Sequence, residues 1–243
     1  MRPCRDAQRF SSLDRVSVGG RPPRTRSAQI LCGALAGPLF VTAFTVIGAA
    51  RRGYDWRRYP VSSLAIGRQG WHQRTNFILA GLLYLCAAAG LRRCDRRRIG
   101  PRAVPALIAG AGIGLIGSGL FVTDYVGDLP SEDPDENSRG PVDAAPTRPT
   151  CAGQMHNLSG IPVFAGIPIA GLASAATAVR SRDYRWACYS AGSSTVMAGS
   201  FLLVVAAIRG QSRLGGKSGI FQRISIATGL GWLSCLSLRG RSQ

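Results

Sequence analysis

Five residues have the side-chain types that chemistry would need: two serines, two histidines and one aspartate. Ser62 and Ser63 stand in the segment Tyr-Pro-Val-Ser-Ser-Leu, Asp124 closes a long apolar run, and the two histidines of the chain are His72 and His156. Serine, histidine and aspartate together supply a nucleophile, a base and an acid that orients the base, as in many hydrolases. His, Asp and His are also suitable ligands for zinc. Hydrolysis and metal binding are therefore both open.

A structural role would explain the same residues without any reaction. Asp124 can pair with an arginine at the membrane surface such as Arg57, His156 can buttress the start of a helix, and Ser62 can cap a helix. The sequence holds no nucleophile elbow, HExxH, P-loop or dinucleotide fingerprint. We take the structural role as the default, with Ser62, Asp124 and His156 as the candidate catalytic set, and predict neither a cofactor nor a bound metal.

The elements that must position these residues are long apolar runs separated by short arginine clusters. Such segregation is typical of a multi-span membrane protein, because about 20 apolar residues in a helix cross a bilayer. We predict an all-α, polytopic integral membrane protein with a six-transmembrane-helix bundle. Its predicted parts are a disordered basic N-terminal tail (1–27), a membrane domain (28–238) with spans at about 28–50, 75–91, 103–123, 157–179, 186–208 and 220–238, and a C-terminal tail (239–243).

Charge and cysteine content exclude other classes. The chain has 243 residues and a formal net charge of +18, which could indicate nucleic-acid binding. However, the arginines lie at the ends of apolar runs and not on one amphipathic face, so we predict no nucleic acid partner. The seven cysteines include no CxxC pair, which argues against a disulfide framework or a zinc site.

Local features of the spans give finer expectations. Pro38 should kink the first span, and Gly33 and Gly37 form a GxxxG helix-contact motif. Two prolines, at 162 and 168, lie inside the fourth span. Arg223 lies one turn inside the sixth span, where we expect its side chain to snorkel to the membrane surface.

Orientation follows from the positive-inside rule. With the N-terminus inside, the inner segments hold 18 Lys and Arg residues and the outer segments hold 12. We therefore predict a multi-pass protein of the cell membrane with both termini in the cytoplasm and the acidic 125–153 loop outside. Membrane lipids are its expected partners, and any small-molecule or lipid ligand stays unidentified.

A stripe of small residues predicts where Asp124 points. Helical spacing of four, three, four and three places five residues on one face of the third span: Gly110, Gly114, Gly117, Phe121 and Asp124. Small residues mark faces where helices approach closely, so Asp124 should point into the bundle. The predicted topology gathers Ser62, His72, Asp124 and His156 at the outer end of the bundle.

At these residues the sequence resembles the domain-of-unknown-function 998 family of six-span bacterial and archaeal membrane proteins. The resemblance rests on Arg-Arg-Gly-Tyr-Asp-Trp-Arg-Arg-Tyr-Pro-Val-Ser-Ser-Leu after the first span, Gly-Leu-Phe-Val-Thr-Asp closing the third, and His156-Asn157 opening the fourth. It implies a six-helix membrane fold and recurring polar positions at Ser62, Asp124 and His156, but no activity. The chain departs from the pattern at Ser63, where an acidic residue is expected, and in its long acidic loop.

Two functional hypotheses follow. The first is a non-enzymatic bundle that serves transport, sensing or structure, because catalytic groups are scarce. The alternative is a membrane-embedded hydrolase that acts on a lipid or lipid-linked substrate through Ser62, Asp124 and His156.

Overall fold

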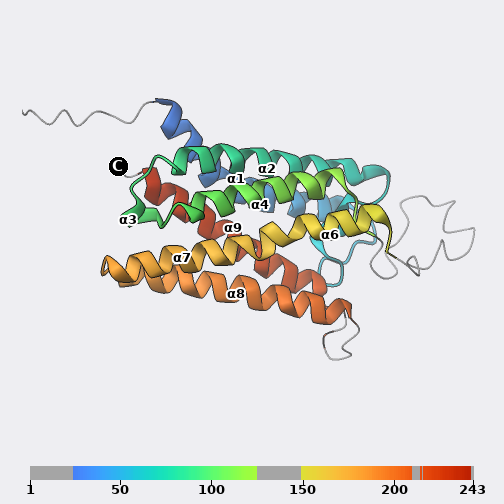
Figure 1. Ribbon diagram of the computed structural model, residues 1–243. Coiled ribbons are helices and arrows are strands. Elements are labelled where there is room, and N and C mark those ends of the chain that lie inside the picture. The colour runs from blue at the N-terminus through green and yellow to red at the C-terminus, as the bar shows by residue number, and fades with distance from the viewer. Residues whose placement is uncertain (1–23, 125–148, 210–213, 215, 242–243) are drawn as a thin grey trace, which may run out of the picture.

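The fold is a bundle of long helices that run side by side, as the computed structural model shows in Figure 1. The structure describes residues 24–124, 149–209, 214 and 216–241. Within them, all regular secondary structure is helical. The elements are α1 (Arg24–Ala50), η1 (Val61–Ala65), η2 (Arg68–Gly70), α2 (Trp71–Leu91), α3 (Arg96–Ile99), α4 (Ala103–Leu120), α6 (Cys151–Phe164), α7 (Gly166–Arg180), α8 (Tyr184–Ile208) and α9 (Ser218–Arg241). The predicted N-terminal tail up to residue 23 and most of the acidic loop lie outside the described residues.

Five helical segments of the described chain are long and apolar enough to cross a membrane. They are Thr25–Ala50, Arg68–Leu91, Ala103–Leu120, Cys151–Arg180 and Tyr184–Ile208. Large apolar side chains such as Leu39, Ile113 and Leu202 stay more than half exposed on their outer faces. An outward apolar surface of this kind is what lipid solvates, so the protein is an all-α polytopic membrane bundle, as predicted.

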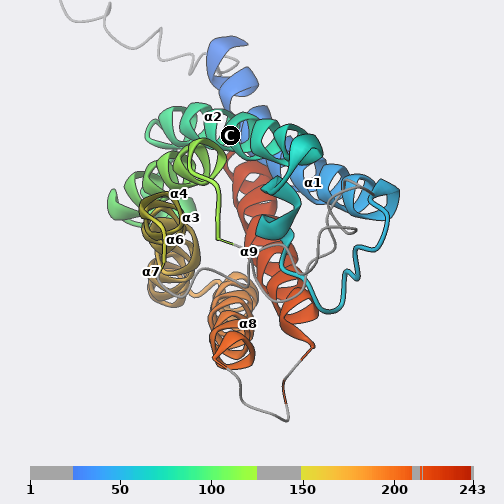
Figure 2. The same cartoon turned by 90° about the vertical axis from the view of Figure 1, so that its right-hand side faces the viewer.

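The sixth predicted span, 220–238, corresponds to α9, which is not among the segments of sufficient apolar character. α9 lies between α1 and α8 and packs along both of them (Figure 2). Its polar side chains are turned inward: Gln222, Ser225 and Ser237 are all buried. The six-helix arrangement is present, but only five of its members have the composition of an independent span.

The predicted GxxxG face of α1 packs within the chain, against α9. A Cβ on Gly33 would lie 2.3 Å from the Ser237 hydroxyl oxygen, and a Cβ on Gly37 would lie 2.8 Å from the Leu230 carbonyl oxygen. Glycine is therefore required at both positions for the two helices to approach this closely.

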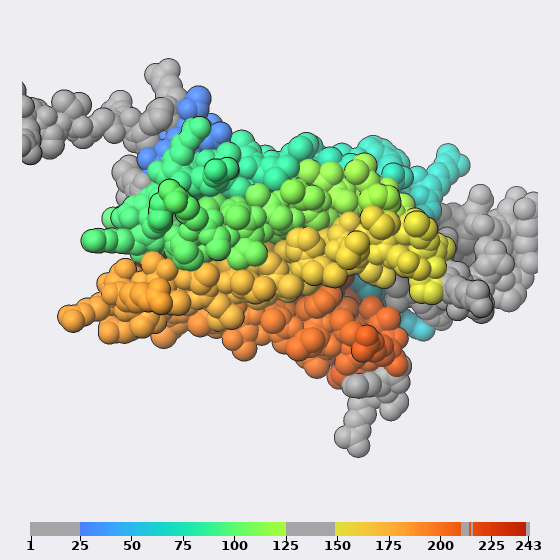
Figure 3. Space-filling model, in the orientation of Figure 1, coloured from blue at the N-terminus to red at the C-terminus, as the bar shows by residue number. Residues whose placement is uncertain are grey.

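The fourth predicted span is broken into α6 and α7, and it begins at Cys151, several residues earlier than the predicted 157. The break falls at Ala165. Pro168 explains its position, because proline lacks the N–H that would bond the carbonyl of Phe164 and its ring crowds that carbonyl. α4, α6, α7 and α8 form one closely packed face of the molecule (Figure 3).

The third span ends earlier than predicted, and this moves Asp124 off the helix. α4 stops at Leu120, and Phe121 is extended with φ −100° and ψ 124°. The small-residue stripe still contacts its neighbour as expected, because Cβ atoms on Gly114 and Gly117 would meet Ser159 of α6. The prediction that Asp124 continues this stripe was wrong, since the helical spacing does not extend to it.

Candidate functional site

A cavity of about 260 Å³ lies at the end of the bundle where α6 begins and α1 ends. Most of its lining is apolar and comes from several helices, with Phe77 of α2, Val163 of α6, Phe201 of α8 and Ile226 of α9 among the contributors. Its polar lining residues are Ser62, Ser118, Thr123, Asp124, His156, Asn157 and Gln222. The cavity thus brings the three candidate residues Ser62, Asp124 and His156 to one site.

Ser62 is half-buried and is the second residue of the short helix η1. It does not cap that helix, because η1 begins after Pro60 and has no side-chain cap. The hydroxyl that bonds backbone is its neighbour's: Ser63 donates to the Pro60 carbonyl at 2.6 Å. Gln222 of α9 holds the start of η1 in place, since its Oε1 accepts a hydrogen bond from the backbone N–H of Val61. Ser62 is therefore held at the cavity wall by a helix far away in the sequence.

Arg223 anchors the segment that carries Ser62. Its guanidinium donates to the carbonyls of Trp56 at 2.7 Å and Tyr59 at 3.2 Å, and to the Tyr54 hydroxyl at 2.9 Å. The guanidinium carbon also lies 5.6 Å from the Phe44 ring centroid. Arg223 was expected to snorkel to the membrane surface, but it binds protein carbonyls because the 54–60 turn folds directly over it.

Tyr54 completes this anchor. Its hydroxyl donates to the carbonyls of Pro60 at 2.9 Å and Tyr59 at 3.1 Å. Burial raises the pKa of the Tyr54 phenol, although the nearby Arg223 charge acts in the opposite direction. The phenol therefore keeps its proton and its role as a donor throughout the neutral range.

Asp124 binds the residue that caps the start of α6. Its two carboxylate oxygens accept the backbone N–H and the side-chain hydroxyl of Thr150, the N-cap residue. Thr150 in turn accepts the N–H of Gly153 at 3.0 Å. A carboxylate is favourable at a helix N-terminus, where unpaired N–H groups concentrate positive charge. Asp124 was expected to pair with an arginine such as Arg57. It instead accepts hydrogen bonds from Thr150.

His156 is buried, with 8 % of its surface exposed, and ties α6 to the end of α4. Its Nδ1 lies 2.9 Å from the carbonyl oxygen of Phe121. A carbonyl only accepts, so Nδ1 donates this hydrogen bond. The ring also meets Phe77 edge to face at 6.2 Å. The expected buttressing role of His156 agrees with these contacts.

The geometry differs from a serine, histidine and aspartate relay. In such a relay the aspartate accepts the Nδ1 proton of the histidine, whereas here the Phe121 carbonyl accepts it. The zinc alternative needed His72 beside Asp124 and His156. His72 is exposed, stacks on Trp71 at 3.8 Å and does not line the cavity. The described residues contain no group of three His, Cys, Asp or Glu side chains suited to a metal.

Sequence reasoning missed Gln222 and Tyr54. The available signal was the pair Gln222-Arg223 inside an otherwise apolar run, because two large polar side chains at membrane depth need partners. Only Arg223 was considered, and it was assigned to the membrane surface. Tyr54 carried no signal, since an aromatic residue beside arginines is equally common at the headgroup level.

The fold and the cavity define a polytopic helical membrane protein with an internal pocket that is apolar except for one group of polar side chains. The chain belongs to the family described as protein of unknown function (DUF998), whose model matches residues 34–239. Neither a curated protein nor a solved structure matches the chain.

Proposed function

We propose that this protein is a non-enzymatic membrane bundle that binds a small amphipathic, lipid-like molecule in the cavity at Ser62. The observation that carries the proposal is the lining itself, in which phenylalanine and aliphatic side chains from six helices (α1, α2, α4, α6, α8 and α9) surround a few polar groups. Ligand pockets in proteins commonly combine an apolar wall with a few polar groups that fix orientation. A sensing or transport role agrees with the broken helix α6–α7 beside the pocket.

The polar groups support binding more than catalysis. Asp124 is engaged with Thr150, and the Nδ1 of His156 is engaged with the Phe121 carbonyl. The other polar groups of the lining, among them Ser62, Asn157 and Gln222, suit recognition of a neutral or weakly polar head group.

A cavity-filling variant tests the proposal. Gly160 lines the cavity, and a Cβ there would make only ordinary contacts with Phe164, at 3.7 and 3.9 Å. Gly160→Leu should therefore fill part of the pocket while the bundle still folds. Gly192→Leu is the matched control, because Gly192 of α8 is exposed and a Cβ there meets nothing within 4 Å.

The assay uses an alkyne-tagged, diazirine-bearing palmitic acid and the purified full-length protein. Labelling of cavity peptides around Phe164 and Phe201 should be competed by untagged palmitic acid in the wild type and in Gly192→Leu. It should be lost in Gly160→Leu at an unchanged melting temperature. Equal labelling in all three proteins would refute binding in this cavity.

The second candidate is a lipid hydrolase that uses Ser62 as nucleophile and His156 as base. It is favoured by the presence of both residues in the lining of one cavity. A fluorophosphonate probe that labels Ser62, with labelling abolished by Ser62→Ala and by His156→Gln, would replace the binding proposal with this one. Absence of labelling in folded protein would remove the hydrolase.

We also propose that the protein lies in the cell membrane with both termini in the cytoplasm. The start of α1 and the end of α9 lie at the same end of the bundle (Figure 1), and arginines crowd that end. A C-terminal alkaline phosphatase fusion should then be inactive and a fluorescent protein fusion bright.

A further inference from the structure

An arginine-lined recess lies at the opposite end of the bundle from the Ser62 cavity. It occupies about 860 Å³ between α3, the end of α7 and the end of α9. Its lining residues are Asp95, Arg97, Arg98, Thr177, Arg180, Ser181, Asp183 and Arg239. Four arginines against two aspartates leave an excess of two positive charges in one open hollow.

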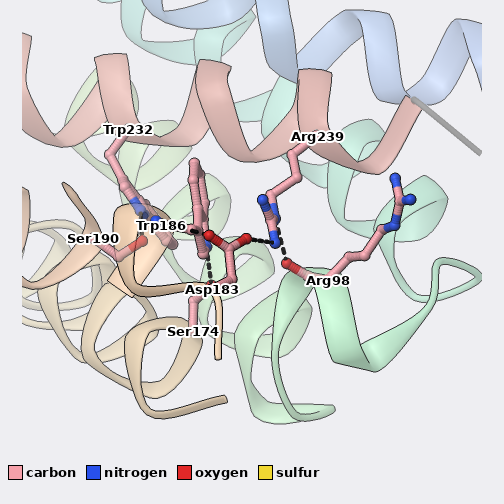
Figure 4. Close-up of polar contacts among 7 residues, drawn as sticks. All are labelled: Arg98, Ser174, Asp183, Trp186, Ser190, Trp232 and Arg239. Carbon is pink, nitrogen blue, oxygen red and sulfur yellow. Dashed lines mark hydrogen bonds and ion pairs between the residues drawn. The ribbon is translucent and has the colours of Figure 1, made fainter. Parts of the chain in front are cut away.

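One side of the recess is built by Arg239, and Figure 4 shows how it is held. Its NH2 donates to Asp183 Oδ2 at 2.6 Å and its Nε donates to the Arg98 carbonyl at 2.8 Å. The guanidinium carbon lies 4.8 Å from the centroid of the Trp186 ring. Trp186 is fixed in turn, because its indole N–H donates to the Ser174 hydroxyl at 3.0 Å.

Both aspartates of the recess are already used. The Asp183 carboxylate accepts the Trp186 backbone N–H at 3.2 Å besides its pair with Arg239. The Asp95 carboxylate caps α3 by accepting the backbone N–H of Arg97 at 2.9 Å. Arg97 and Arg180 line the same recess and are exposed, so their charges can face a ligand.

The surroundings of the recess indicate a ligand with an apolar part. Val179 and Tyr184 flank the turn between α7 and α8, with 51 % and 61 % of their surfaces exposed. The recess lies at the ends of membrane-crossing helices, where lipid head groups are found. Arginine binds phosphate through paired N–H donors, and basic pockets between helices on the cytoplasmic side suit anionic head groups.

We propose that this recess binds the phosphate of an anionic membrane lipid, with Arg97 and Arg180 as its ligands and Val179 and Tyr184 beside the acyl chains. The site is independent of the Ser62 cavity, because the two share no residue and lie at opposite ends of the bundle.

The test measures binding of dioleoyl phosphatidic acid to the full-length protein in neutral detergent by native mass spectrometry. Dioleoyl phosphatidylcholine serves as the reference lipid. The double variant Arg97→Gln/Arg180→Gln should weaken phosphatidic acid binding about thirtyfold, since we expect each arginine that contacts the lipid phosphate directly to contribute about five- to sixfold. Each single variant should weaken binding about five- to sixfold, so the test gives a result even if the double variant folds poorly.

The matched control is Arg92→Gln/Arg93→Gln. It removes the same charge at the same end of the bundle, from exposed residues that do not line the recess. Its phosphatidic acid binding should stay within about twofold of wild type. If the control loses as much as the recess variant, diffuse charge attraction explains binding and the proposal falls. Full competition by millimolar inorganic phosphate would overturn the lipid assignment in favour of free phosphate.

Discussion

Replacement of Arg223 by glutamine should strongly destabilise the bundle. The guanidinium donates to the carbonyls of Trp56, Tyr59 and Gly219 and to the Tyr54 hydroxyl, at distances between 2.7 and 3.2 Å. Hydrogen bonds that involve a charged group contribute about 1.5–3 kcal/mol each in favourable cases.

The four bonds do not add fully, because they share one donor group and the side chain is half-exposed. A loss of about 3–5 kcal/mol follows from this discount. For a chain of this length, each kcal/mol shifts the melting temperature by about 2–4 °C, so a decrease of about 6–20 °C is expected.

The measurement is thermal unfolding of the purified protein in detergent. Arg52→Gln is the control, since Arg52 is exposed and belongs to the same loop. Arg223→Lys should fall between the two, because an ammonium cannot reproduce the planar fork of the guanidinium. If Arg223→Gln melts within about 2 °C of wild type, Arg223 does not anchor the 54–60 turn and our account of how Ser62 is positioned fails.

Two further predictions concern the two ends of the bundle. Gly153→Ala should place a Cβ about 2.1 Å from a carboxylate oxygen of Asp124 and disrupt the N-cap of α6. The free energy of unfolding should fall by about 1–3 kcal/mol, which the same melting assay measures. Gly192→Ala is the control and should be neutral or slightly stabilising. At the other end, the Trp186 backbone N–H and then the Arg239 guanidinium hold the pKa of Asp183 below its ordinary value of 3.8. A carboxyl group whose pKa is lowered by folding stabilises the protein above its unfolded pKa, and this stabilisation is lost as the pH falls through the folded pKa. The melting temperature of the wild type should therefore fall more steeply below about pH 4 than that of Asp183→Asn.

The sequence predicted the helices well because apolar length is a local property. It also predicted that Gly33 and Gly37 face another helix, since small residues at that spacing have few other uses in a membrane. The break at Ala165 was within reach, because Pro168 lies inside the predicted fourth span, where it removes the hydrogen bond to the carbonyl four residues earlier. The end of the third span could not be predicted, because the glycine-rich sequence gave no sign that the chain would leave the helix at Phe121.

The candidate site shows the same division between local and long-range information. Placement of Ser62, Asp124 and His156 at one end of the bundle required only the topology. Their bonding partners depended on contacts across the fold, such as the Phe121 carbonyl at His156 and the Thr150 groups at Asp124. No sequence pattern encodes such pairings, because any nearby backbone group can serve as the partner.

The inward polarity of α9 has a consequence for how the protein is made. α9 is synthesised after the other described helices, and it lacks the apolar composition that the five candidate spans share. Two of its buried serines contact helices that have already emerged: Ser225 donates to the Met197 carbonyl of α8 at 2.8 Å, and Ser237, whose hydroxyl bonds within α9, packs beside Gly33 of α1. We therefore expect integration of α9 to depend on its contacts with the earlier helices, so that replacement of α1 by a polyleucine span should leave α9 outside the bilayer.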